Sequence, residues 1–253
     1  MKKIARFTAA IAVAFAATGA HAAGAPAPVK NVVLVHGFFA DGSGWRGVAD
    51  ILTRDGYNVS IVQEPETSLA DDVKATERAL AAMDGKAILV GHSYGGVVIT
   101  QAGNNTKVAG LVYVAAFAPD VGESLLTLVK KMPPASDAIK PTSDDHLLFD
   151  PARFHADFAA DLPAADAAFM ARSQVMPTVQ TAGTAVTQAA WRTRPSWAIV
   201  SSADRTVNPA LERFMAKRAG AQTVEIDGSH ATFIVHSAEV AKVIEQAAVS
   251  ASH

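Results

Sequence analysis

The pentapeptide GHSYG at residues 91–95 is the part of the sequence whose residue types and spacing most directly suggest chemistry. It follows the apolar run 86–90 and precedes the helix-like stretch 96–100, so the serine falls at a turn from strand to helix. Glycines two residues to either side leave room for such a tight turn, which presents the serine hydroxyl at a helix N-terminus. The pattern predicts that Ser93 is the nucleophile of an acyl transfer, the alternative being a surface turn that contains a serine.

A base and an acid are needed beside this serine, because a hydroxyl is a weak nucleophile near neutral pH. His230 follows the last predicted strand, 222–226, and Asp204 follows the strand before it, 196–201. Both therefore lie at the carboxyl edge of the sheet, where ligands and catalytic groups gather in such folds. The chain order Ser, Asp, His is that of an α/β-hydrolase fold. We predict a catalytic triad of Ser93, Asp204 and His230.

Other ionisable residues are weaker candidates for these two roles. His236, six residues beyond His230, lies near the start of the last predicted helix, where a structural role is simpler. Asp227 is too close to His230 in sequence to orient its ring, and Asp120 falls at the hinge of an inserted segment. The alternative interpretation of Asp204 is a turn-initiating aspartate.

Acyl transfer also needs hydrogen-bond donors for the negative oxygen that develops on the substrate, each contributing about 3 kcal/mol. The backbone N–H of Tyr94, directly after the serine, is one predicted donor. The loop VHGFF after the first strand should supply the second from the N–H of Phe38. Phe39 is either a wall of the acyl pocket or a packing residue. His36 and His92 lie in tight glycine turns and are expected to brace those loops.

A second motif points to different chemistry. The sequence GSGWRG at 42–47 matches GxGxxG, and Glu64 stands about twenty residues beyond, where a ribose-binding acid would lie. A dinucleotide fingerprint begins as the strand ends, however, whereas residues 38–41 separate this motif from the first strand and its Gly37. We also expect no metal site, because the sequence has no HExxH motif and no cysteine.

The elements that must position these residues follow an alternation of short apolar runs and amphipathic segments, which is typical of a mostly parallel sheet. Each predicted strand is nearly all apolar, as strands covered on both faces should be. The predicted strands are 31–35, 58–62, 86–90, 108–115, 196–201 and 222–226.

Helices are predicted between these strands. Apolar residues recur at helical spacing over 45–52, and 55–56 ends that helix. The stretch 68–71 has the form of a capping box. The face that follows it is expected to be Leu69, Val73, Thr76, Leu80 and Met83. The pair 208–209, Asn-Pro, should open another helix, and Ser237 should cap the last.

The segment 119–191 interrupts this alternation with prolines, scattered phenylalanines and no convincing strand. We expect it to form an inserted helical cap, with Asp150-Pro151 at one helix start. The remaining parts of the core are expected to be 23–118 and 192–253.

Residues 1–22 have the features of a secretory signal peptide: three basic residues, an apolar stretch and a cleavage site of AxA type. We therefore expect a protein exported to the periplasm or secreted. The apolar stretch is too short for a comfortable membrane anchor, so no stable membrane insertion is expected after cleavage. A net charge of −2 without a basic cluster argues against a nucleic-acid partner, and the absence of cysteine excludes disulfides and thiolate chemistry.

With these pieces in place, the sequence resembles the α/β-hydrolase superfamily over the mature chain. The nearest group contains plant methylesterases, hydroxynitrile lyases and their bacterial esterase relatives. The resemblance rests on VLVHG at 33–37, GHSYGG at 91–96, LVYVAAFAPD at 111–120 and GSH at 228–230. It implies a mostly parallel sheet flanked by helices, with an inserted helical cap, and a Ser-His-Asp ester hydrolase without a cofactor.

Single residues distinguish the reactions that different members of this superfamily catalyse. Hydroxynitrile lyases of the group carry a lysine directly after the catalytic histidine, where this chain has Ala231, and dehalogenases and epoxide hydrolases carry aspartate in place of Ser93. The expected function is an exported serine carboxylesterase acting on small to medium carboxylic esters through an acyl-enzyme. Lactone or amide hydrolysis, cofactor-free haloperoxidase chemistry and a non-catalytic small-molecule receptor are the alternatives. The natural substrate and the oligomeric state are left open.

Overall fold

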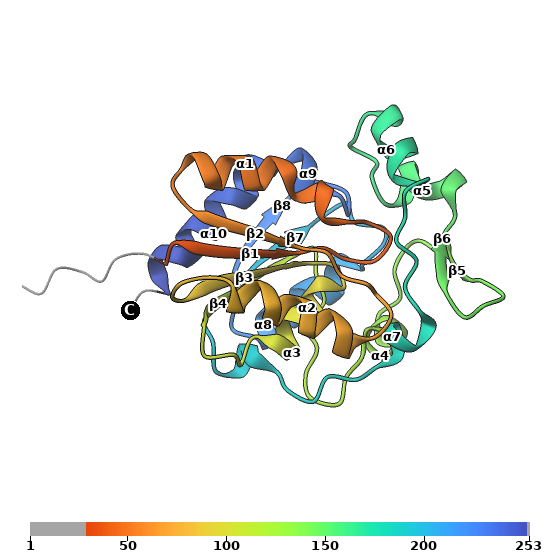
Figure 1. Ribbon diagram of the computed structural model, residues 1–253. Coiled ribbons are helices and arrows are strands. Elements are labelled where there is room, and N and C mark those ends of the chain that lie inside the picture. Colours follow the sequence, from red (N-terminus) through yellow and green to blue (C-terminus); the bar gives the residue numbers. More distant parts are fainter. Residues whose placement is uncertain (1–28, 252–253) are drawn as a thin grey trace, which may run out of the picture.

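Six strands form one parallel sheet at the centre of the molecule, in the order β2-β1-β3-β4-β7-β8 (Figure 1). The computed structural model describes residues 29–251, so the predicted signal peptide lies outside the described residues. The strands are β1 (Asn31–Val35), β2 (Asn58–Val62), β3 (Ala87–His92), β4 (Val108–Val114), β7 (Ser196–Ser201) and β8 (Gln222–Ile226). Every strand predicted from the sequence is present, within two residues at each end, and the predicted fold class is confirmed.

The two edge strands depart from one expectation. β1, β3, β4 and β7 are buried along their whole length, whereas β2 is mostly half-buried and β8 is mostly exposed. The prediction that every strand is covered on both faces is therefore wrong for β2 and β8. They lie at the two ends of the sheet, where the covering layers of helices stop.

Helices cover both faces of the sheet (Figure 1). On one face lie α2 (Leu69–Ala81), α3 (Gly95–Ala102) and α8 (Pro209–Arg218), whose apolar side chains share a core with Val33 and Val35. On the other lie α1 (Arg46–Arg54), α9 (Thr232–Val235) and α10 (Ser237–Ser250), which pack against Val32 and Leu34. Successive side chains of β1 thus point into the two opposite cores, because side chains alternate between the faces of a sheet along each strand. No helix of residues 29–251 is long and apolar enough to cross a membrane.

Three predicted helix starts are confirmed by their capping bonds. The side chains of Ser68, Asp150 and Asn208 accept backbone N–H groups at the starts of α2, α5 and α8. The prediction that Ser237 caps the last helix is wrong, because Ser237 is already the first residue of α10. The N–H of His236 donates to the carbonyl of Thr232, so α10 follows α9 directly and leaves no extended position for a capping serine.

The inserted segment, residues 119–191, lies beyond the carboxyl ends of the strands (Figure 1). Its helices are α4 (Leu125–Lys131), α5 (Pro151–Asp157), α6 (Ala164–Met170) and α7 (Val179–Gly183). It also contains an antiparallel pair, β5 (Ile139–Pro141) and β6 (Leu147–Phe149), so the expectation of no strand here is wrong. Strands of three residues are too short to show a period of two in sequence.

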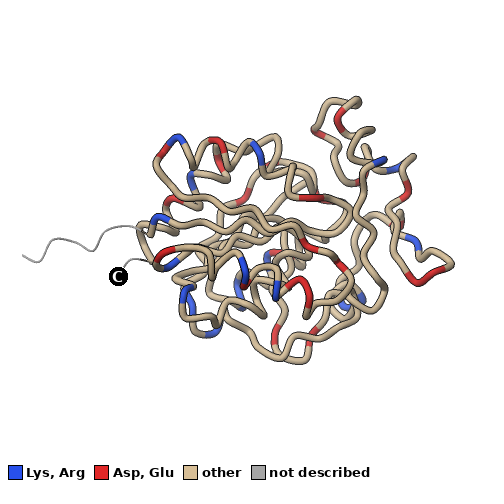
Figure 2. The backbone as a smooth tube through the Cα atoms, in the orientation of Figure 1, with Lys and Arg blue, Asp and Glu red and all other residues tan. Residues whose placement is uncertain are grey.

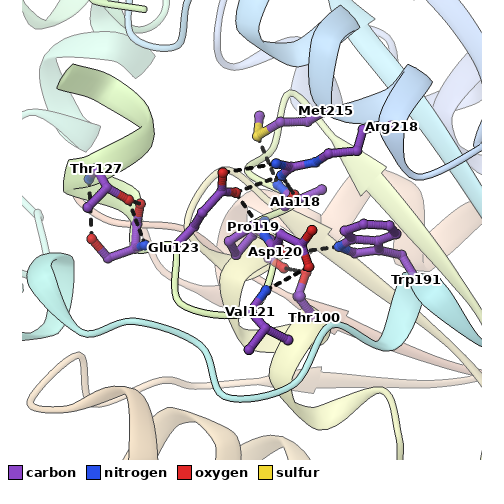
Figure 3. Close-up of polar contacts among 12 residues, drawn as sticks. Thr100, Ala118, Pro119, Asp120, Val121, Glu123, Thr127, Trp191, Met215 and Arg218 are labelled. Carbon is purple, nitrogen blue, oxygen red and sulfur yellow. Dashed lines mark hydrogen bonds and ion pairs between the residues drawn. The ribbon is translucent and has the colours of Figure 1, made fainter. Parts of the chain in front are cut away.

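The two ends of the inserted segment are joined to each other and to α8 (Figure 3). The indole N–H of Trp191 donates to the carbonyl of Pro119 at 2.8 Å. Arg218 forms two hydrogen bonds with the carboxylate of Glu123, at 2.9 and 2.7 Å, and a third to the carbonyl of Ala118 at 2.8 Å. The base of the segment is therefore fixed by charged and neutral hydrogen bonds together.

Charged residues of both signs are interspersed along the described chain, and no basic stripe stands out among residues 29–251 (Figure 2). This distribution agrees with the small net charge of −2. It offers no concentrated positive surface of the kind that a polyanion would need.

Candidate active site

Ser93 lies in the turn between β3 and α3 and has a left-handed backbone, with φ of +53°. This conformation is unfavourable for a residue with a side chain and persists only where the surroundings enforce it. The loop after β1 helps to enforce it by packing closely against this turn. A Cβ at Gly95, two residues after Ser93, would lie 2.5 Å from the carbonyl oxygen of His36 in that loop. The turn therefore has the tight geometry that GHSYG indicates.

His230 and Asp204 are brought together from the loops after β8 and β7. The His230 Nδ1 lies 2.6 Å from the Asp204 Oδ2, and both side chains are buried. The other carboxylate oxygen of Asp204 accepts the N–H groups of Thr206 and Val207, at 2.7 and 2.8 Å. The carboxylate thus favours a proton on Nδ1, which leaves the lone pair of the imidazole on Nε2.

The Nε2 of His230 has no hydrogen-bond partner in the described chain. It does not bond to the Ser93 hydroxyl in this structure, but both residues line one cavity of about 330 Å³. Hydrogen bonds of this kind are often long without substrate and tighten when it binds. The structure therefore joins His230 to Asp204 and places His230 and Ser93 on the same cavity.

The two amides predicted to bind the oxyanion are without an acceptor in residues 29–251. The amides next to them in the chain do have acceptors. The N–H of Phe39 donates to the carbonyl of Val175, and the N–H of Ser93 donates to the carbonyl of Val114. The loop that carries Phe38 packs closely against Ser93, because a Cβ on the preceding Gly37 would lie 2.6 Å from the Ser93 Cβ. The amides of Phe38 and Tyr94 thus remain available beside Ser93.

The wall of the cavity is mostly apolar. The core contributes Phe38, Phe39, Phe117 and Val207, and the inserted segment contributes Leu125, Leu126, Val129, Pro134, Ile139 and Leu147. Asp137 is the one carboxylate of the lining, and it is mostly exposed and paired with Arg153. No lysine or arginine lines the cavity. The cavity therefore suits a neutral, apolar ligand.

The other histidines and acids weighed in the sequence lie elsewhere. His92 contacts the carbonyl of His230 through Nε2 at 2.9 Å, and burial lowers its pKa well below the ordinary value, so a neutral ring braces the histidine loop. His236 contacts Glu239 at the surface, at 3.3 Å. Asp227 accepts a hydrogen bond from Ser202.

Asp120 also lies away from the reacting groups. Its carboxylate forms an ion pair with Arg192, and this pair sits at the base of the inserted segment, where a hinge role was expected.

Two acids behind the site were not singled out by sequence. The Asp161 carboxylate, in the inserted segment, accepts the N–H of Ser229 at 2.8 Å and also its hydroxyl, which holds the residue before His230. Glu212 on α8 accepts the N–H of Ser201 at 3.1 Å, and its burial and the charge of Asp204 raise its pKa well above the ordinary value. Neither residue carries a local sequence signal, because their partners are 68 and 11 residues away and lie in other elements.

Three residues of types that bind metals gather beside the nucleophile turn. Ligand atoms of His36, Glu64 and Glu66 lie within 4.8 Å of one another. The His36 Nε2 accepts the N–H of Glu64 at 3.0 Å, so the neutral ring carries its proton on Nδ1, which faces Glu66 at 3.5 Å. This ring therefore offers no lone pair to a cation between the carboxylates. Burial instead raises the pKa values of Glu64 and Glu66 well above the ordinary range, which favours their protonated forms.

The GxGxxG match does not take the form of a dinucleotide fingerprint. Residues Gly42–Trp45 form a 3₁₀ turn capped by Asp41 and separated from the end of β1. Glu64, the acid that would hold a ribose, is 4% exposed and forms part of the acidic group just described.

Comparison with known proteins gives both a family and a set of similar folds. A family model described as "Alpha/beta hydrolase family" matches residues 32–243. A carbendazim-hydrolysing esterase of Nocardioides sp. (strain SG-4G) is 33% identical over 125 residues, which cover 44% of this chain and 52% of that protein. The match thus spans about half the length of that relative.

Solved structures resemble the whole described fold. A pyrethroid hydrolase from Sphingobium faniae JZ-2 superposes with a TM-score of 0.74 at 23% identity, covering 87% of this chain and 97% of that one. An extracellular α/β-hydrolase from a Paenibacillus species, described as sharing structural and functional homology with tobacco salicylic acid binding protein 2, gives 0.73 at 19% identity, covering 86% and 98%. At these identities the likeness shows a shared fold.

Proposed function

This chain belongs to the alpha/beta hydrolase family, and from that membership we propose that it is a serine carboxylesterase whose triad is Ser93, His230 and Asp204. The observation that carries the proposal is the 2.6 Å contact between His230 and Asp204, together with the cavity that both His230 and Ser93 line. The esterase named among the relatives agrees with this chemistry.

The proposed reaction has two steps that use the same residues. The Ser93 Oγ attacks the ester carbonyl carbon while the His230 Nε2 takes its proton, and the N–H groups of Phe38 and Tyr94 stabilise the oxyanion. The alcohol leaves with the proton from His230. A water molecule, deprotonated by His230, then attacks the acyl-enzyme and releases the acid. Asp204 keeps the ring oriented and stabilises the imidazolium in both steps.

The cavity supports a neutral ester of small to medium size as the substrate. Its volume of about 330 Å³ is enough for a compact ligand, and its apolar lining offers no cation to an acidic one. We propose that the inserted segment, residues 119–191, acts as the cap of this cavity, because helix α4 and the β5–β6 pair supply much of the lining.

We also propose that the protein is exported to the periplasm or beyond, on the basis of the signal-like features of residues 1–22. The experiment is N-terminal sequencing of the protein recovered from fractionated cells and medium. A mature chain that begins near Ala23 is expected, and an intact Met1 in the cytoplasmic fraction would contradict export.

A fluorophosphonate probe tests the esterase proposal. We expect mass spectrometry to find the label on Ser93, and Ser93→Ala to lower the turnover of a neutral nitrophenyl ester by at least about 10³-fold. His230→Ala should abolish labelling, whereas Ser60→Ala, on the edge strand β2, should label as the wild type does. Label on another residue, or full turnover by Ser93→Ala, would overturn the proposal. A parallel panel of lactones and anilides ranks the alternative substrates.

A further inference from the structure

The side chains of the two residues proposed to bind the oxyanion are joined to each other. The rings of Phe38 and Tyr94 are stacked, with centroids 3.9 Å apart and planes inclined by 17°. The Tyr94 ring is fully buried, and its hydroxyl donates to the Oδ2 of Asp72 at 2.8 Å. The Oδ1 of Asp72 accepts the N–H of Glu66, also at 2.8 Å. Asp72 on α2 is thus tied to the nucleophile turn and, through the stacked rings, to the loop after β1.

We propose that Asp72 is a positioning residue of the oxyanion hole, acting through the Tyr94 hydroxyl and the Tyr94–Phe38 stack. The inference rests on the proposed function, because it concerns the same two amides. Asp72 touches neither the substrate nor the reacting atoms, and its effect is confined to the direction of two backbone N–H groups.

The backbone at this turn needs such support. The direction of the Tyr94 N–H depends on the ψ of Ser93, a residue held in the left-handed region. Tyr94 is fixed at both ends. Its backbone is the N-cap of α3, and its hydroxyl hydrogen-bonds to Asp72 on α2. A shift of the ring would therefore turn the peptide that carries the amide.

Phe38 depends on the same contact. Its own amide has no acceptor in residues 29–251, so no backbone bond at that atom fixes its direction. The stack on Tyr94 is a side-chain contact between this loop and the turn that carries Ser93. Oxyanion donors act only when they are preorganised, so a small loss of alignment lowers the rate of the chemical step without weakening ground-state binding.

Two substitutions and a matched control test this role. Tyr94→Phe removes the hydroxyl and keeps the stacked ring, and Asp72→Asn keeps the shape and removes the charge. Tyr113→Phe is the control, because Tyr113 is also buried and its hydroxyl hydrogen-bonds to Thr100, at 3.0 Å, on the same face of the sheet. Turnover of a neutral nitrophenyl ester and inhibition by a trifluoromethyl ketone, which forms a tetrahedral adduct on serine, are measured for each.

We expect Tyr94→Phe and Asp72→Asn each to lower kcat about tenfold with KM within twofold, and to weaken the trifluoromethyl ketone by a similar factor. The double variant should be no worse than the more impaired single variant, because both act on one bond. Tyr113→Phe should lower the melting temperature and leave kcat unchanged.

Unchanged kcat in Tyr94→Phe and Asp72→Asn, or an equal loss in Tyr113→Phe, would overturn the positioning role. The Ser93→Ala variant in the same assay separates the two proposals. If turnover depends on Ser93 while Tyr94→Phe remains fully active, only the positioning role fails. If Ser93→Ala retains turnover, the proposed function fails and the positioning role fails with it.

Discussion

Buried carboxyl groups lie behind the site on two sides, and they differ in their partners. Asp157, at the end of α5, is 4% exposed and bonds to Arg153, Arg205 and Ser136 at 2.5, 2.7 and 2.8 Å. Glu64 and Glu66, beside the nucleophile turn, are equally buried, and no lysine or arginine among residues 29–251 pairs with them.

The two environments have opposite effects on ionisation. Burial raises the pKa of Asp157, but the hydrogen bonds from Arg205 and Ser136 and the charge of Arg153 outweigh it and hold the pKa below the ordinary value. Burial dominates for Glu64 and Glu66, whose pKa values are raised well above it, and burial raises that of the nearby Asp72 to about 6. Buried carboxyl groups thus favour the charged form on one side of the site and the protonated form on the other.

Of the variants considered, the one that removes the cations from the first group should show the largest loss of stability at pH 7. The double variant Arg153→Met/Arg205→Met leaves the Asp157 carboxylate buried without a positive partner. We expect urea unfolding at pH 7 to show a loss of about 2 kcal/mol, below the range for fully buried pairs because both guanidinium groups are half exposed. Adding Asp157→Asn should restore most of the loss. A double variant as stable as the wild type would show that the two arginines do not stabilise the Asp157 carboxylate, and would contradict the contrast with Glu64 and Glu66.

The second group should produce a pH dependence of the opposite sign. Glu64 and Glu66 bind protons more tightly in the folded state than in the unfolded state, so stability should fall as the pH rises above the unfolded value of about 4.5, by up to about 1.4 kcal/mol per pH unit for each group. Asp72 adds to this slope up to about pH 6, and His36 and Tyr94 face the same group.

The measurement is urea unfolding at several values between pH 5 and pH 8. Glu64→Gln/Glu66→Gln should have a flatter slope than the wild type over this range, because its side chains cannot ionise. Asp157→Asn should change the pH dependence of stability only below about pH 4, where the native carboxylate would take up a proton. Equal slopes in the wild type and the glutamine variant would show that these two carboxyls do not carry the extra protons.

The smallest effect is expected at a solvent-exposed ion pair between an arginine and a carboxylate. Arg213 and Glu225 form an ion pair in which both side chains are about half exposed, at 47% and 46%. Glu225→Gln should leave the urea midpoint and its pH dependence unchanged within error, because exposed pairs are screened by solvent. A clear shift here would mean that burial is not what distinguishes the first two groups.

The parts of the fold that could be predicted from sequence are those with local signals. Strands in the sheet interior are continuous apolar runs, and Ser93, Asp204 and His230 could be proposed because each follows a predicted strand within four residues. The starts of α2, α5 and α8 carry their own capping residues.

What could not be predicted depends on contacts between distant residues. Asp72 lies in the first turn of α2 beside another aspartate, and the predicted apolar face omitted it because its side chain is charged. Asp161 and Ser229 are 68 residues apart, and only the folded chain brings them together. Short-range patterns of hydrophobicity contain no information on such pairs.

The inserted segment is bound to the two loops that carry Asp204 and His230. The carbonyl of Phe158 accepts the N–H of Ala231, the Asp161 carboxylate holds Ser229, and the carbonyl of Asp157 accepts the hydroxyl of Thr206. Melting this segment would therefore release the loops that carry Asp204 and His230 in the same cooperative transition. Heat inactivation and loss of the segment's native contacts should then follow one curve, without a partly unfolded species that still turns over substrate.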